Sequence, residues 1–253
     1  MGLSGGVDSA VTAVLAVRAL GQENVRVLLM PSQFSSDHSV NDARDLANTL
    51  GIQYDIVPIK DIYEAFMDKL SPIFGDLPFN VTEENIQARI RGILNMAISN
   101  KFGHILLNTT NKSEMAVGYG TLYGDLCGGI SVLGDVYKTE VYELVKYINK
   151  DEAIIPHNTI NKPPSAELRP NQKDSDSLPE YHELDPILFE YIEKRTDPQD
   201  IIAMGYDEAV VKRVLKLVNI NEFKRYQSAP VLRISPKAFG MGRLMPIVAK
   251  YLS

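Results

Sequence analysis

The chain has a single cysteine, Cys127, among its 253 residues, and it lacks any long apolar run. One cysteine excludes an intrachain disulfide, and no apolar stretch approaches the ~20 residues that a helix needs to span a bilayer. The first residues also lack the basic segment, apolar core and cleavage site of a secretory signal peptide. We therefore expect a protein of the reducing cytoplasm.

Positive charge is also scarce. The 26 Lys and Arg residues are outnumbered by 32 Asp and Glu residues, and the net charge is −6. This balance argues against a broad electrostatic contact with nucleic acid. No internal repeat or low-complexity tract is found, and a hydrophobic content of 45% allows one substantial core. The composition indicates a single domain over residues 1–253 whose ligands are small molecules.

Residues 2–9, Gly-Leu-Ser-Gly-Gly-Val-Asp-Ser, are the most informative stretch. Gly5 and Gly6 leave no side chains over a turn whose N–H groups can point inward together. Helix-forming residues follow at once, so the positive end of a helix dipole would face the same place and favour a phosphate. No Lys-Ser or Lys-Thr pair follows, which excludes a Walker loop. The alternative is a strand-to-helix turn, capped by Ser4 or Asp8, that binds nothing.

Two carboxylates could hold a metal ion that accompanies a phosphate. Asp8 lies in the first turn of the predicted helix, and Glu114 follows the apolar run 105–107. Mg²⁺ prefers oxygen ligands and keeps waters and substrate phosphates, so both side chains could join around one ion. Alternatively, Asp8 caps a helix, and Glu114 with Ser113 only caps and charges another helix start. Spacing leaves both alternatives open.

Apolar strands alternate with amphipathic helices after the loop. The runs 25–29, 54–57 and 105–107 predict buried parallel strands, and apolar residues at helical spacing predict helices between them. Only residues 1–3 precede the loop, so we expect a truncated first strand and missing residues upstream. The pattern predicts an α/β fold with an open, doubly wound parallel sheet, whose ligands bind beyond the carboxyl ends of the strands.

Several polar residues outside the loop are ambiguous. A long helix is predicted to open at Thr82, and its residues Arg89 and Arg91 are, on the residues alone, best explained as part of a solvated face. Residues 118–129 predict a long loop. Lys138 begins a helix, which the dipole disfavours unless an anion lies nearby. Residues 162–176 are either a solvated linker or a substrate-covering loop.

The motifs read together resemble the NAD synthetases, a family of ATP pyrophosphatases with an adenine nucleotide alpha hydrolase-like, Rossmann-like fold. The similarity covers nearly the whole chain and is greatest to the synthetase domain of the glutamine-dependent form. It rests on the loop at 4–9 and on the segments Met-Pro-Ser at 30–32, Glu-Asn-Ile-Gln-Ala-Arg-Ile-Arg at 84–91, Asn-Thr-Thr-Asn-Lys-Ser-Glu at 108–114, Tyr-Gly-Asp at 123–125, Pro-Pro-Ser-Ala-Glu-Leu-Arg-Pro at 163–170 and Glu-Phe-Lys-Arg at 222–225.

The resemblance implies a ligase of NAD biosynthesis that amidates deamido-NAD. ATP would activate the nicotinate carboxylate as an acyl adenylate with release of pyrophosphate, and ammonia would then displace AMP. The implied cofactor is Mg²⁺, with ATP as co-substrate. The implied partners are a homo-oligomer and an upstream, nitrilase-like glutaminase domain, with no role for nucleic acid or membrane.

The resemblance also implies roles for individual residues. Asp8, Glu114 and Lys138 would be catalytic, with Asp8 and Glu114 binding the metal. The ATP-binding residues would be Gly2, Leu3, Ser4, Gly5, Gly6, Val7, Asp8, Ser9, Thr109, Lys138 and Ser165. The deamido-NAD-binding residues would be Asn85, Arg89, Arg91, Glu114, Asp125 and Lys224. For the two arginines this implication reverses the interpretation as a solvated face.

Two departures limit the transfer of roles. The ammonia-only form carries Lys where this chain has Leu122 and Asp where it has Gly129, so contacts from this loop are not carried over from that form. Cys127 lies in a Gly-rich loop without an amidase setting, so the chain is expected to use ammonia but not to hydrolyse glutamine. The alternative functions are another amidoligase of the group, such as guanylate synthetase, or a non-catalytic nucleotide-binding module.

Overall fold

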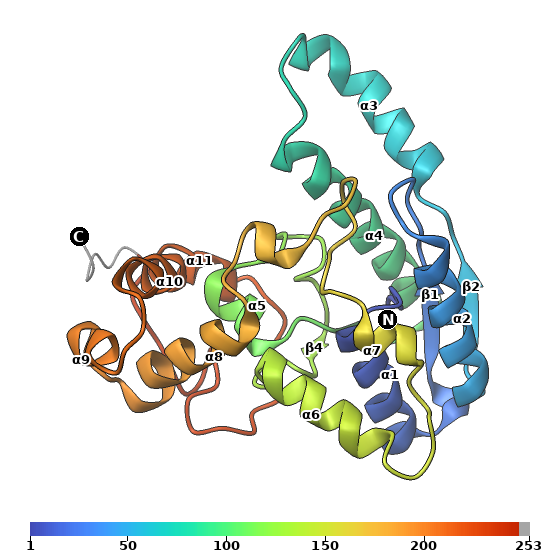
Figure 1. The fold of residues 1–253 in the computed structure, drawn as a ribbon. Helices are drawn as coiled ribbons and strands as arrows, with labels where there is room; N and C mark the ends of the chain where they lie inside the picture. The colour runs from blue at the N-terminus through green and yellow to red at the C-terminus, as the bar shows by residue number, and fades with distance from the viewer. Residues whose placement is uncertain (248–253) are drawn as a thin grey trace.

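Short parallel strands and long helices build the α/β fold in Figure 1. The computed structural model of the chain describes residues 1–247. Strand β1 (Arg26–Leu29) pairs in parallel with β2 (Gln53–Ile56), and β3 (Leu107–Asn108) pairs in parallel with β4 (Ile130–Ser131). The predicted class and strand direction are confirmed, but the sheet is present as two short pairs.

The segment before the glycine loop behaves as the predicted first strand. Gly2 forms a parallel bridge with Leu28, and the Leu3 N–H donates to the Leu28 carbonyl over 2.9 Å. The prediction of a strand at 105–107 was wrong in position, because Ile105 is 74% exposed and pairing begins only at Leu107. An apolar run by itself therefore does not locate this strand.

Most of the other regular structure in residues 1–247 is helical. Their bounds are α1 (Val7–Leu20), α2 (Asp37–Leu50), α3 (Lys60–Phe74), α4 (Val81–Phe102), α5 (Lys112–Val117), α6 (Lys138–Ile148), α7 (His157–Asn161), α8 (Tyr181–Phe189), α9 (Pro198–Ala203), α10 (Glu208–Ile220) and α11 (Glu222–Arg225). A 3₁₀ turn at Asp174–Asp176 interrupts the irregular stretch after α7, and a π-helical turn at Glu190–Lys194 follows α8. None of the helices in residues 1–247 combines the length and apolarity needed to cross a membrane.

Local capping sets the helix bounds. Ser36 caps α2 by accepting from the Ser39 N–H over 3.2 Å. The predicted start of the long helix at Thr82 was wrong, because Asn80 is the cap. Its side chain accepts from the Thr82 N–H over 2.8 Å, and Glu83 accepts from the Asn80 N–H over 2.8 Å. This reciprocal pair satisfies two donors that a helix start leaves free.

Three apolar clusters hold the elements together. One joins α1, β1, α2 and α6, a second joins α5, α8 and α10, and a third lies between β1, α3 and α4. The hairpin of α3 and α4 projects from the body, while α8 to α11 gather on the opposite side (Figure 1). The first two clusters meet where α5 and α6 lie, and this junction supports the site described below.

A buried ion cluster fastens the C-terminal segment to this junction. The ammonium of Lys112 is fully buried and donates to Asp135 over 2.6 Å and to the Ser235 hydroxyl over 3.0 Å, and it also pairs with Glu193. Asp135 in turn accepts the N–H groups of Ile234 and Ser235 over 2.8 and 2.5 Å. A lysine at this depth is tolerated only because it is fully paired.

Replacing Lys112 tests the contribution of this cluster. Lys112→Met keeps most of the side-chain volume but leaves two buried carboxylates without their cation, so we expect a loss of about 3–5 kcal/mol in the free energy of unfolding. The matched control is Lys212→Met, which removes an exposed pair with Glu208 of 2.7 Å and should cost less than about 1 kcal/mol. Urea denaturation measures the free energy of unfolding of both variants. Similar losses in the two would contradict a stabilising role of the buried ion cluster.

Candidate active site

A cavity of about 870 Å³ opens beyond the carboxyl ends of β1 and β3. Its wall is formed by the glycine loop, α4, the loop 118–127, the start of α6 and the segment 162–177. Of the predicted site residues, only Gly5 does not line it. Those that do are Gly2, Leu3, Ser4, Gly6, Val7, Asp8, Ser9, Asn85, Arg89, Arg91, Thr109, Glu114, Asp125, Lys138, Ser165 and Lys224. Residues far apart in the sequence thus meet around one cavity.

The glycine loop leaves the start of α1 open to the cavity. Gly5 has φ +82°, and a Cβ there would lie 2.3 Å from the Ser39 carbonyl oxygen. Glycine is required on both counts. Gly6 precedes the helix, and no side chain among residues 1–247 caps its first turn. Of the two alternatives for Asp8, the cap is therefore contradicted, and the N–H groups of this turn suit an anionic ligand.

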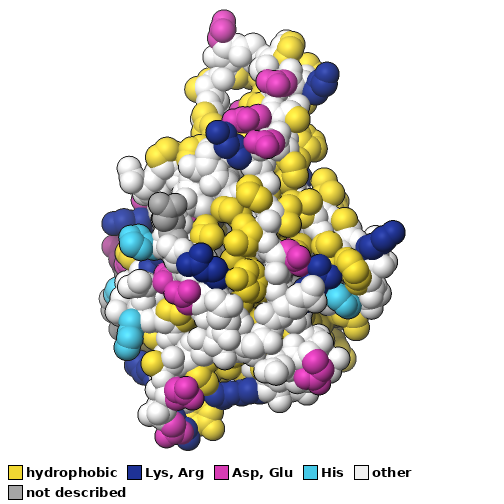
Figure 2. All heavy atoms as spheres, turned by 90° about the vertical axis from the view of Figure 1, so that its right-hand side faces the viewer, with side chains coloured by type: hydrophobic (Ala, Val, Ile, Leu, Met, Phe, Trp, Pro, Cys, Tyr) yellow, Lys and Arg dark blue, Asp and Glu magenta, His cyan; other side chains and the backbone are white. Residues whose placement is uncertain are grey.

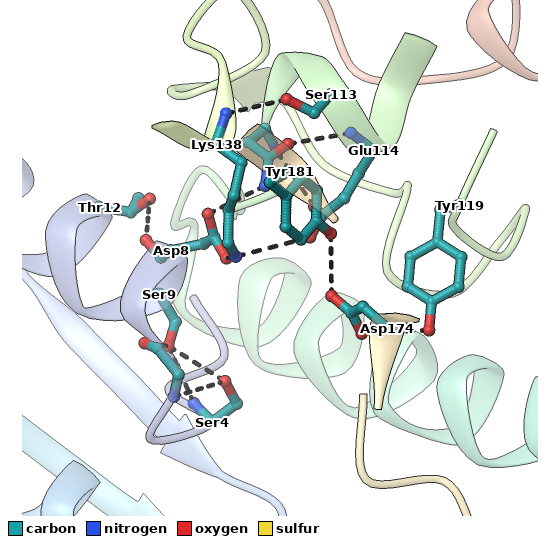
Figure 3. A network of polar contacts seen from close by, with 12 residues as sticks. Ser4, Asp8, Ser9, Thr12, Ser113, Glu114, Tyr119, Lys138, Asp174 and Tyr181 are labelled. Carbon is teal, nitrogen blue, oxygen red and sulfur yellow. Dashed lines mark hydrogen bonds and ion pairs between the residues drawn. The ribbon is translucent and has the colours of Figure 1, made fainter. Parts of the chain in front are cut away.

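The hydroxyls of Ser4 and Ser9 stabilise this loop from within. They lie 3.1 Å apart, and the Ser4 hydroxyl accepts from the Gly6 N–H over 3.3 Å. The Ser9 hydroxyl donates to the Gly6 carbonyl over 3.0 Å. Figure 3 shows the pair below the start of α1, close to the side chain of Asp8. The loop conformation is thus held by its own side chains.

Lys138 lies between two carboxylates. Its ammonium pairs with Asp8 and lies 3.9 Å from Glu114, as Figure 3 shows. Burial alone would lower the pKa of Lys138, but the charges of Asp8 and Glu114 outweigh it and raise that pKa. The predicted anion beside this first-turn lysine is therefore present as protein carboxylates. Lys138 stays charged and holds the two acids together.

Glu114 has two roles in the structure. Its carboxylate accepts from the Asn111 N–H over 3.2 Å and its own N–H donates to the Asn111 side chain over 2.9 Å, which closes a capping box at α5. Burial and the charge of Asp8 raise the pKa of Glu114 well above its usual value, against the opposing charge of Lys138. Glu114 therefore takes part in the cap of α5, whereas Ser113 does not, and the charge of Asp8 still acts on the same carboxylate.

A third carboxylate, Asp174, was not predicted as part of the site. It accepts from the Tyr119 hydroxyl over 3.2 Å and from the Tyr181 hydroxyl over 2.9 Å, and it lines the cavity. The Tyr181 ring also lies 5.4 Å from the Lys138 ammonium (Figure 3). Burial raises the pKa of Asp174, while the Tyr181 hydrogen bond and the charge of Lys138 oppose it. The only sequence signal was its place in a charge-rich irregular segment.

The segment 162–177, here called the cover segment, lies across the cavity mouth. Lys162 and Glu167 pair with each other and contact Ser39 at the start of α2, where the Ser39 hydroxyl donates to Glu167 over 2.9 Å. Farther along, the Gln87 side chain donates to the Leu168 carbonyl over 2.8 Å. These contacts with α2 and α4 favour the covering loop over the solvated linker.

The polar residues of α4 form only a partly solvated face, with Arg89 exposed and Gln87 and Arg91 turned inward. Gln87 is fully buried, and the Arg91 guanidinium donates to the Met30 carbonyl over 3.0 Å. Burial lowers the pKa of Arg91 to about 10, although the charges of Glu167 and Asp125 oppose it. Arg91 nevertheless remains a cation at neutral pH, and its position beside the cavity suits an anionic ligand.

The remaining predicted residues gather where α4 meets the loop 118–127. Asn85 accepts from the Thr121 hydroxyl over 2.6 Å, and Asp125 accepts from the Thr121 N–H over 2.8 Å. Arg89 is exposed and donates to the Leu122 carbonyl over 3.3 Å. Lys224 donates to the carbonyls of residues 118 and 120 over 2.7 and 2.9 Å. Thr109 and Ser165 also line the cavity.

Asp8 and Glu114 fit a magnesium ion that brings its own ligands. Within residues 1–247, no cluster of three or more His, Cys, Asp or Glu side chains is arranged to hold a metal ion. Two carboxylates facing one another are still a suitable donor set, because Mg²⁺ usually takes one or two carboxylates and completes its shell with water and phosphate oxygens. A metal here would depend on a phosphate-bearing ligand.

The chain is similar to known proteins over nearly its whole length. A family model described as NAD synthase matches residues 1–228. The glutamine-dependent NAD(+) synthetase of Synechocystis sp. is 52% identical over 251 residues, covering 99% of this chain and 45% of that protein. The corresponding protein of Acinetobacter baylyi is 52% identical over 98% of this chain and 46% of its own length. The chain spans about half the length of these relatives.

Solved structures show the same similarity. The NH3-dependent NAD synthetase of Campylobacter jejuni, in complex with the nitrate ion, aligns with a TM-score of 0.71 and 32% identity over 92% of this chain and 88% of that one. The NMN synthetase of Francisella tularensis aligns with a TM-score of 0.71 and 28% identity over 93% and 87%. With the family model covering most of its length, the chain belongs to the NAD synthase family.

Proposed function

We propose that the chain catalyses the ATP-dependent amidation of deamido-NAD to NAD, with release of AMP and pyrophosphate. One observation carries this proposal: the uncapped start of α1 opens onto the same cavity as the Asp8–Lys138–Glu114 group. Such an arrangement suits a nucleotide triphosphate, because N–H donors and a cation face its charge while two carboxylates accept its metal.

In the first step the nicotinate carboxylate oxygen attacks the α-phosphorus of ATP. An O–P bond forms to give the acyl adenylate, and the bond to the pyrophosphate oxygen breaks. The N–H groups of residues 5–9 and the ammonium of Lys138 would take up charge on the leaving pyrophosphate, and Thr109 and Ser165 would contact the ATP. Asp8 and Glu114 would hold Mg²⁺, which when bound supplies further charge neutralisation.

In the second step ammonia attacks the acyl carbon. The new C–N bond replaces the C–O bond to AMP, and the nitrogen gives up a proton as NAD is formed. Asn85, Arg89, Arg91, Asp125 and Lys224 would orient the dinucleotide. Little covalent participation by protein groups is needed, since holding two anionic substrates in line accounts for most of the rate acceleration.

We also propose that the nitrogen comes from a glutamine-hydrolysing domain upstream of residue 1. The relatives that are about twice as long are named glutamine-dependent synthetases. Within the present chain, burial raises the pKa of the Cys127 thiol, with a smaller effect of the Asp125 charge. A thiol with a raised pKa is a poor nucleophile. Residues 1–253 alone are therefore expected to accept free ammonia and not glutamine.

The choice of acceptor tests the reaction itself. With ATP, Mg²⁺ and ammonium, AMP and pyrophosphate should form when deamido-NAD is offered and not when xanthylate is offered. Because one structural neighbour is named an NMN synthetase, nicotinate mononucleotide is offered as a third acceptor. AMP formation with xanthylate alone, or with the mononucleotide alone, would contradict the proposal, and ATP binding without any turnover would favour a non-catalytic module.

The two carboxylates are tested by neutral replacements. Asp8→Asn and Glu114→Gln keep the side-chain shapes but remove charge from the proposed metal ligands, so kcat should fall by roughly 100- to 1,000-fold. The Mg²⁺ concentration needed for half-maximal rate should rise in both variants. Glu208→Gln, which changes an exposed carboxylate far from the cavity, is the control and should leave both quantities unchanged. An unaltered Mg²⁺ dependence in Asp8→Asn would contradict the metal assignment.

We further propose that the chain forms a homo-oligomer through the outer face of α4. One face of the molecule carries a band of hydrophobic side chains below the projecting hairpin (Figure 2). Ile93 on α4 is 59% exposed and Met96 is half-exposed, and both line an open groove of about 680 Å³ that reaches residues 227–230. Grouped apolar side chains of this kind commonly mark interfaces.

Sedimentation measures this association. The native chain should sediment as an oligomer at micromolar concentration, and Ile93→Asp should shift it to the monomer because a charge would be buried in the contact. Leu20→Asp, which changes an equally exposed apolar residue at the end of α1, is the control and should not dissociate it. A native chain that sediments as a monomer would contradict the proposal.

A further inference from the structure

Helix α6 begins at Lys138 without a side-chain cap from its own flanking residue. The first N–H groups of a helix lack intrahelical partners and must be satisfied from elsewhere. Here the Lys138 N–H donates to the Ser113 hydroxyl of α5 over 2.9 Å. The Thr139 N–H donates to Asp185 of α8 over 2.8 Å. Two other helices therefore supply the cap of α6.

The two capping groups are themselves joined. The Ser113 hydroxyl donates to the other oxygen of Asp185 over 2.5 Å, and both residues are buried. Because its proton is committed to the carboxylate, the hydroxyl presents its lone pairs to the Lys138 N–H. The Asp185 carboxylate also lies at the positive end of the α6 dipole, which favours a negative charge there. The Asp185 carboxylate thus contacts the first turns of both α5, through Ser113, and α6, through Thr139.

These contacts lie directly behind the proposed catalytic group. The backbone of Lys138 receives the cap, while its side chain reaches Asp8 on the cavity side (Figure 3). Glu114 is the residue after Ser113, so the same hydroxyl fixes the turn that carries the second carboxylate. Neither Ser113 nor Asp185 lines the cavity. Their effect on a substrate would therefore pass through Lys138 and Glu114.

We propose that Asp185 and Ser113 are positioning residues that set the placement of Lys138 relative to Asp8 and Glu114. This inference rests on the proposed function. It states that the buried contact between Ser113 and Asp185, outside the cavity, keeps the Lys138 ammonium in place for the proposed reaction. A displacement of about 1 Å in a catalytic group can cost roughly 100-fold in rate. The one local capping contact at the start of α6 is the Tyr137 N–H donating to Glu140 over 2.8 Å, which leaves the N–H groups of Lys138 and Thr139 to Ser113 and Asp185.

The experiment compares Asp185→Asn and Ser113→Ala with the native chain in the deamido-NAD assay. Asp185→Asn keeps the shape but places an N–H₂ or a neutral oxygen against the Thr139 N–H and the Ser113 hydroxyl. We expect kcat to fall roughly 10- to 100-fold. KM for deamido-NAD should stay within about 2-fold, because all the residues proposed to bind it except Glu114 lie on α4, the loop 118–127 and α11.

The matched control is Asp207→Asn. Asp207 caps α10 by accepting from the Val210 N–H over 3.0 Å, at a place that does not line the cavity. Loss of this cap should lower the midpoint temperature of thermal unfolding without lowering kcat. If Asp185→Asn and Ser113→Ala also lower only the thermal midpoint, they are structural caps and the inference is overturned. A rise in KM with unchanged kcat would overturn it as well.

Hydrogen exchange gives a readout that does not require turnover. The amides of Lys138 and Thr139 should lose protection in Asp185→Asn, and they should keep it in Asp207→Asn. If the native chain turns over no acceptor, the proposed function fails while this measurement still tests the cap. Unchanged protection at both amides would overturn the inference whatever the activity, and so would lost protection accompanied by native kcat.

Discussion

The site depends on how a buried ammonium is balanced. Lys138 holds Asp8 and Glu114 on one side of the cavity, and Asp174 approaches from the cover segment. Without the cation, acids enclosed together would repel one another and take up protons. In the proposed function, a nucleotide with its magnesium ion would add both negative and positive charge here, so the three side chains could change ion-pair partners without leaving a charge unpaired.

The backbone around this group is arranged to let a ligand approach closely. Gly5 takes a left-handed conformation against Ser39, which is also a contact point of the cover segment. The glycine loop, the start of α2 and the cover segment therefore share one neighbourhood. The hydroxyl of Ser39 contacts both Lys162 and Glu167. Ser39 therefore contacts both the glycine turn and the cover segment.

Short sequence patterns predicted the parts of the fold that are determined by residues close together in the sequence. The glycine turn and the helix that starts directly after it follow from such patterns, and both were found. Capping at Asn80 was missed because Thr82 and Asn85 offered a competing local pattern. The prediction of where β3 begins was wrong for another reason, because the partner strand, and not apolarity, decides where pairing starts.

Tertiary contacts explain what sequence reasoning missed in the site. Asp174 is identified only by the tyrosines that reach it from residues 119 and 181, which are separated from it in sequence. The burial of Gln87 likewise depends on the cover segment folding back over α4. The prediction that Glu114 faces Asp8 came from family resemblance, and spacing alone left it open. The roles of these residues in binding and catalysis stay predictions until the assays are done.

The ion cluster around Lys112 bears on where the folded unit ends. The family model stops at residue 228, yet Ser235 reaches back to Asp135 and to the lysine at the start of α5. A protein cut at that boundary would lack the Ser235 hydroxyl and the two backbone N–H groups that contact the buried side chains of Lys112 and Asp135. A shortened version made for crystallisation or for fusion to another protein should keep the segment beyond 228, because Ser235 contacts the buried ammonium of Lys112 at the start of α5.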